Sequence, residues 1–130
     1  SSIIITAGVK GPDLELKKAL SEMQSKMMET NQKMKVSDVQ IENLKRSITH
    51  AELTDAEISG LSDDIRVYES LGRMFMLSTK GEVKKDLEDQ RKKAADKIKV
   101  LEGNKEYLER NLKENENSLR ELVLQKRSQS

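Results

Sequence analysis

Two long segments of this sequence carry apolar residues in alternating steps of four and three, and this repeat limits the possible folds more than any other feature. The first segment repeats through Leu16, Leu20, Met23, Met27, Thr30, Met34, Ser37, Ile41, Leu44, Ile48 and Ala51. The second repeats through Lys84, Leu87, Arg91, Ala94, Ile98, Leu101, Lys105, Leu108, Leu112, Asn115, Leu119, Leu122 and Lys126. Such spacing, sustained over several heptads, keeps one side of a helix facing a partner helix. We therefore predict two coiled-coil helices, over residues 13–51 and 83–127.

The composition favours long helices over a compact domain. Charged residues make up 36% of the 130 residues and aromatic residues only 2%, so little apolar material is available for a core that is covered on all sides. Dense charge with regular apolar spacing is typical of coiled coils. Pro12 and Asp13 suit the start of the first helix. We expect residues 1–12 and 128–130 to form flexible tails.

Charge and residue content also exclude several classes of function. The 24 basic and 23 acidic residues are interleaved, so no basic face favours nucleic acid. The chain has no cysteine and therefore no disulfide bond that would indicate an oxidising compartment. We expect a cytoplasmic location. No apolar run is long enough to cross a membrane. His50, the single histidine, has an expected structural role near a helix end, and we predict no catalytic residue, metal site or cofactor.

The two helices can fold back on each other, and an antiparallel pairing leaves two registers that differ by one heptad. One register pairs Leu44 with Ile98. The other would place Leu44 opposite Arg91 and Leu20 opposite Asn115. Setting a polar group against an apolar one in this way costs about 1–3 kcal/mol. We therefore predict the first register.

The segment between the helices opens with a signal for a short helix. Thr54 and Glu57 have the spacing of a capping box, in which a threonine begins a helix and a glutamate three residues later bonds back to it. We predict that the first long helix ends at residue 51. Residues 52–64 are then expected to form a linker with a short helix that ends near Leu61.

Residues 65–82 are predicted to form a β-hairpin, because they contain the run VYESLGRMFMLS with a glycine near its centre. Met74 and Met76 would face one way and Phe75 and Leu77 the other, so both faces would be apolar. A lone hairpin is marginal in water, and exposed strand edges pair with other chains. We predict an assembly element that other chains complete, although a hairpin folded over its own helix ends is the alternative. The residues expected to carry assembly are Val67, Tyr68, Leu71, Gly72, Met74, Phe75, Met76 and Leu77.

The order of these elements and several sequence runs resemble the β-type subunits of the prefoldin family. The matching runs are DLELKKAL, HAELTDAEI, YESLGRMFML and KEYLERNLKE, and the resemblance covers residues 13–127. It implies a mainly α fold: an antiparallel two-helix coiled coil whose central hairpin joins an intersubunit β-barrel. It also implies a heterohexamer of two α-type and four β-type chains. The family's implied activity is ATP-independent capture of nascent or non-native proteins, notably actin and tubulin, for delivery to the cytosolic group II chaperonin.

In such proteins the tips of the coils hold the client, and here the tip joins the start of the first helix to the end of the second. The candidate client-binding residues are Leu14, Leu16, Leu20, Leu119, Leu122, Val123 and Leu124. Val123 and Leu124 lie off the repeat and so off the predicted packed surface, and for these two residues client binding and a purely structural role are equally open. The alternative for Leu20, Leu119 and Leu122 is that they only close the coil. A different function is also open: a coiled-coil adaptor that dimerises through its hairpin and tethers two folded partners.

Overall fold

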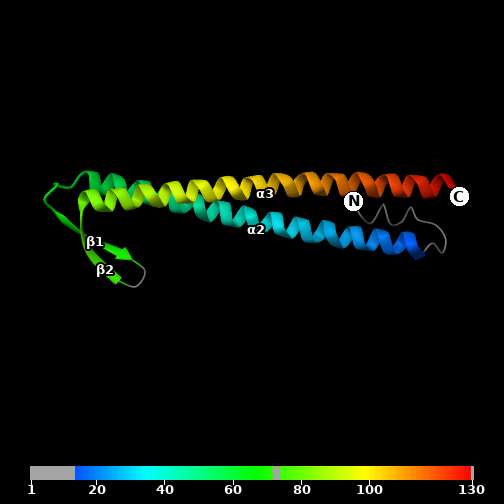
Figure 1. The fold of residues 1–130 in the computed structure, drawn as a ribbon, viewed down its shortest axis with the longest axis horizontal. Coiled ribbons are helices and arrows are strands. Elements are labelled where there is room, and N and C mark those ends of the chain that lie inside the picture. Colours follow the sequence, from blue (N-terminus) through cyan, green and yellow to red (C-terminus); the bar gives the residue numbers. More distant parts are fainter. Residues whose placement is uncertain (1–13, 72–73, 130) are drawn as a thin grey trace. The chain divides into compact units, whose positions relative to one another are not determined.

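The computed structural model describes residues 14–71 and 74–129, and these residues form two long helices separated by a hairpin (Figure 1). In chain order the elements are α2 (Leu14–Ser59), β1 (Arg66–Leu71), β2 (Met74–Thr79) and α3 (Lys80–Gln129). The predicted mainly α fold with a central hairpin is confirmed. The expected tail over residues 1–12 lies outside the described residues. At the other end, α3 continues two residues beyond the expected boundary at 127.

Helix α2 runs without interruption to Ser59, so the predicted break after residue 51 and the separate short helix are wrong. The hydroxyl of Thr54 does not begin a new helix but donates to the carbonyl oxygen of His50 at 3.0 Å, one turn back in the same helix. The heptad spacing continues past Ala51 to Ile58, which is buried. Packing of these extra residues, about two turns, outweighs the local capping signal, because tertiary contacts supply most of the stability of a helix.

The chain divides into two compact units. The first joins residues 14–38 to residues 103–129, and the second comprises residues 39–102. In the first unit the core contains Leu16, Leu20, Leu119 and Val123, with Met23, Met27 and Leu122 packed against it. Since the start of α2 meets the end of α3, the two helices are antiparallel. Burial of each such leucine contributes about 1.5–3 kcal/mol.

The second unit is also built along the predicted repeat. Its buried apolar residues are Ile41, Ala51, Ile58, Val83 and Ala94. Leu44 of α2 and Leu101 of α3 line one groove. The end of α2 lies against the start of α3, so the helices are antiparallel in this unit as well. Arg91, at a position of the repeat, is unfavourable for stability. Its Nε atom is buried and lacks a hydrogen-bond partner among the described residues.

An ion pair in the first unit supports the predicted register. The ammonium group of Lys105 lies 2.6 Å from a carboxylate oxygen of Asp38. The predicted register places Lys105 opposite Ser37, the residue next to Asp38 in the chain. The rejected register would place Lys105 opposite Thr30, about 12 Å away along α2 at 1.5 Å per residue. The side chains of Lys105 and Asp38 could not span that separation to form the ion pair.

The hairpin consists of β1 and β2 paired antiparallel from Arg66 opposite Thr79 to Leu71 opposite Met74. Residues 72 and 73 separate the two strands in the sequence. Gly72, and the side chains of Leu71, Met74, Phe75 and Met76, lie outside the described part of the chain. Strand β2 passes directly into α3, whereas residues 60–65 connect α2 to β1.

Candidate functional site

The hairpin presents apolar side chains that the described part of the chain does not cover. Tyr68 lies directly opposite Leu77 in the pairing, so the two side chains are on the same face. Tyr68 is 75% exposed and Leu77 is 53% exposed. The neighbouring pair, Val67 and Ser78, faces the other way, and Ser78 is buried. One face at the base of the hairpin is therefore covered and the other is open.

The open face has the chemistry of a strand-pairing surface. A two-stranded sheet leaves the outer edge of each strand without a backbone partner. Added strands from other chains would pair with these edges and would cover Tyr68 and Leu77. The large contact area of a tyrosine makes it a frequent energetic centre of protein interfaces. The arrangement can therefore serve as an assembly element.

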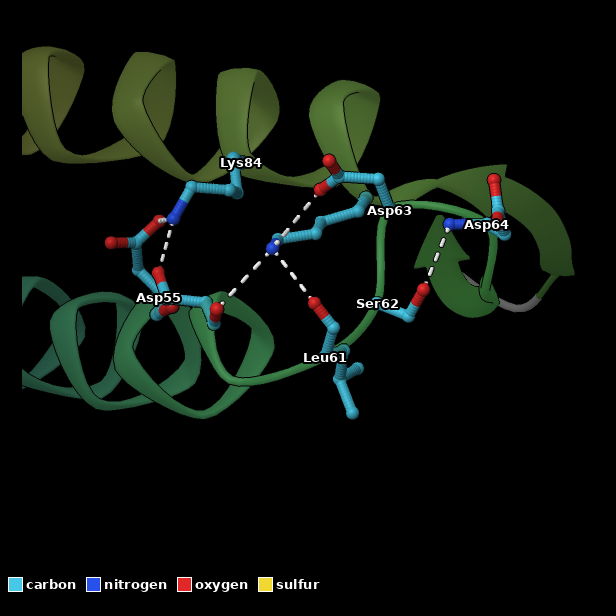
Figure 2. Close-up of polar contacts among 8 residues, drawn as sticks. Asp55, Leu61, Ser62, Asp63, Asp64 and Lys84 are labelled. Carbon is cyan, nitrogen blue, oxygen red and sulfur yellow. Dashed lines mark hydrogen bonds and ion pairs between the residues drawn. The ribbon is translucent and has the colours of Figure 1, made fainter.

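The base of the hairpin is held by polar contacts that the sequence does not predict (Figure 2). The ammonium group of Lys80 donates to the carbonyl oxygens of Ser59 at 3.2 Å and Leu61 at 2.8 Å, and it lies 3.3 Å from the carboxylate of Asp63. One turn later, Lys84 lies 3.2 Å from the carboxylate of Asp55. These contacts join the first turns of α3 to the end of α2 within the second unit.

A true capping interaction begins α3. The hydroxyl oxygen of Thr79 accepts a hydrogen bond from the backbone N–H of Glu82 at 3.2 Å. Thr79 and Glu82 have the same spacing as a capping box, so this signal was present in the sequence. It marks the helix start at Lys80, earlier than the predicted residue 83. Lys80 itself gave no signal, because its partners come from a segment about twenty residues earlier.

At the end where α2 begins and α3 finishes, the predicted client-binding residues divide into two groups. Leu16, Leu20, Leu119 and Val123 form a closed core, with Leu122 packed against it. Leu14 is 75% exposed and Leu124 is 63% exposed. The expectation that Val123 lies off the packed surface is wrong, because Val123 is 8% exposed within this core. The apolar stripe of a packed helix commonly includes a position beside the heptad repeat.

The described residues contain no group of three or more histidine, cysteine, aspartate or glutamate side chains placed to hold a metal ion. No helix within the same residues combines the length and apolar character of a membrane span.

Comparison with known proteins agrees with this architecture. Residues 21–126 match the family described as Prefoldin subunit. The chain is 50% identical over 117 residues to Prefoldin subunit 1 of Danio rerio, which covers 90% of this chain and 96% of the relative. It is 49% identical to Prefoldin subunit 1 of Homo sapiens, with the same coverage. The prefoldin beta subunit from Thermococcus strain KS-1 shares the fold, with a TM-score of 0.69, 20% identity, and coverage of 88% of this chain and 97% of that one.

Prefoldin subunits are components of a chaperone, and they form heteromeric complexes with other prefoldin subunits. The two antiparallel helices and the hairpin of this chain agree with the fold shared with the prefoldin beta subunit. The matched family covers most of both helices and the whole hairpin, and the relatives match over nearly their full length. The chain therefore belongs to the prefoldin family and is a subunit of the prefoldin co-chaperone.

Proposed function

We propose that this chain joins a cytoplasmic hexamer of two α-type and four β-type subunits through its hairpin. In this complex the tip of its coil captures nascent or non-native proteins, actin and tubulin among them, without ATP. The complex then passes them to the cytosolic group II chaperonin. The observation that carries the proposal is the exposure of Leu14 and Leu124 beside a core that is already closed.

Exposed leucines at a helix end suit the capture of unfolded chains. The core of the first unit is complete without Leu14 and Leu124, so these side chains are free to contact apolar surface on a client. Helix ends also open locally at low energetic cost, which lets the contact adapt to clients of different shape. A binding surface for one folded partner would instead require fixed, complementary geometry.

The proposal is tested with the reconstituted complex and chemically denatured actin. Leu14→Ser combined with Leu124→Ser should weaken suppression of actin aggregation and reduce the amount of actin transferred to the chaperonin. Leu53→Ser is the matched control, because Leu53 is 62% exposed but lies in the second unit. This control should behave like the unchanged complex.

The same assay separates the chaperone from the adaptor. An adaptor would bind particular folded proteins and would not suppress aggregation of denatured actin. If the unchanged complex bound only native partners, the proposed client capture would be wrong. If it suppressed aggregation but the Leu14 and Leu124 variant did so equally well, capture would be assigned to another surface.

A further inference from the structure

The end of α2 lacks a cation of its own. Its last turn contains no basic residue, although the final carbonyl groups of a helix have no partner within the helix and favour positive charge. Lys80, the first residue of α3, supplies that charge by donating to the carbonyl oxygens of Ser59 and Leu61. One helix is thus capped by a side chain from the next.

The ammonium group of Lys80 is fully used by these contacts. A lysine ammonium has three N–H donors, and three acceptors surround it: the carbonyl oxygens of Ser59 and Leu61 and the carboxylate of Asp63. The Lys80 side chain is only 16% exposed, whereas that of Asp63 is 94% exposed. The Lys80 side chain is therefore held in place, mainly by its hydrogen bonds to the backbone of α2 and of the connection that follows it.

Helix α3 itself gives no reason for a lysine at this position. The N-terminus of a helix carries partial positive charge, so a cation in the first turn is unfavourable. Lys80 occupies the first residue of α3. Its contact with the end of α2 offsets that local cost, which indicates a role in joining the two helices rather than in starting the second.

Lys84 strengthens the same junction from one turn further along α3. It forms an ion pair with Asp55 and donates a hydrogen bond to the hydroxyl oxygen of Ser59. Figure 2 shows Lys84 directed at Asp55 while Leu61 and Asp63 lie on the following connection. The last turn of α2 is thus held by two lysines.

We infer that Lys80 and Lys84 are positioning residues that set the orientation of the hairpin for assembly. They bind the end of α2 and the start of the 60–65 connection to the start of α3. Strand β2 continues directly into α3 at Lys80, so a fixed Lys80 also fixes the base of β2. The connection to β1 and the base of β2 are then held at one point. This inference rests on the proposed assembly through the hairpin.

The test is a competition between variant and isotope-labelled unchanged chain for a limited supply of sister subunits, read by native mass spectrometry. Lys80→Met should enter the complex about tenfold less than the unchanged chain, since it loses hydrogen bonds from a charged donor. Lys80→Arg retains the donors and should restore entry to within about twofold. Lys85→Met, at an exposed neighbouring position, is the matched control and should compete equally.

A second readout distinguishes positioning from simple loss of folding. Lys80→Met loses the contacts with the end of α2 but also removes an unfavourable cation from the N-terminus of α3, so the two effects offset each other and the helical melting temperature should change little. A fall in melting that accompanies the loss of entry would overturn the inference, as would equal entry of Lys80→Met and Lys85→Met or a failure of Lys80→Arg to restore entry.

If the unchanged chain entered no complex, the proposed function would fail while the junction could still be tested. Amide hydrogen exchange of residues 61–71 in the full chain should then be about tenfold faster in Lys80→Met than in Lys85→Met. Equal exchange in the two variants would overturn the inference by itself.

Discussion

Tyr68 and Leu77 lie directly opposite each other in the hairpin, and both side chains are exposed to solvent. The pair places an aromatic and an aliphatic side chain on one open face of a sheet that has two strands within the described residues. Such a sheet is marginal in water. Its open face and edges are the basis of the proposed assembly through the hairpin.

Replacing this pair should block assembly and leave the coil intact. Tyr68→Ser combined with Leu77→Ser should reduce affinity for the sister subunits by at least about thirtyfold, equivalent to the 2 kcal/mol that marks an interface hot spot. Native mass spectrometry of the reconstituted complex measures the loss. Leu53→Ser changes an equally exposed leucine on α2 and should have no effect. Loss of assembly in that control would indicate a broader interface than the hairpin.

The closed core of the first unit predicts a large difference between neighbouring leucines. Leu119 is completely buried, whereas Leu124 is 63% exposed. Leu119→Ala should lower the free energy of unfolding by about 2–5 kcal/mol, and Leu124→Ala should change it by less than about 0.5 kcal/mol. Urea denaturation followed by circular dichroism measures both values. Similar losses in the two variants would mean that Leu124 belongs to the core.

Much of this fold could be predicted because the repeat records directly which side of each helix is packed. Residues such as Ile41 and Ala94 lie on the predicted repeat and are buried. The predicted register is supported by the Lys105–Asp38 pair. The hairpin was visible because its composition differs so sharply from that of its flanks.

The remaining features depend on contacts between distant residues. Thr54 has a capping-box spacing but remains within α2, since Ile58 is buried one turn later. Val123 lies beside the repeat and becomes buried only because Leu16 and Leu20 of α2 pack against it. Lys80 is separated in the sequence from its partners Ser59 and Leu61 by the whole hairpin. The repeat does extend from Ala51 to Ile58, whereas neither local propensity nor periodicity carries information about the contacts of Lys80.

The predicted register can be checked by cross-linking within the second unit. Cysteines introduced by Ile41→Cys and Leu101→Cys should form a disulfide bond or react with a short bifunctional reagent, because the register brings these positions together. The pair Ile41→Cys and Ala94→Cys is the control, since those positions meet only in the rejected register. Cross-linking of the control pair alone would contradict the register.

Gly103 offers a way to stabilise the coil. It lies inside α3, and a Cβ atom added there would meet no atom within 4 Å apart from its chain neighbours and the adjacent backbone of its own helix. Gly103→Ala should therefore raise the free energy of unfolding by about 1 kcal/mol, through the higher helix propensity of alanine. Gly81→Ala also meets open space but lies in the first turn of α3, so its gain should be smaller. Thermal melting of the two variants measures the difference, and a loss of stability in Gly103→Ala would show a hidden contact.

Assembly through the hairpin is tested most directly by native mass spectrometry of the full chain purified gently from its own cells. We expect the chain to be recovered in a complex of six small subunits, and Tyr68→Ser combined with Leu77→Ser to be recovered without them. Recovery of the unchanged chain as a monomer or homodimer would contradict assembly through the hairpin and would favour the adaptor.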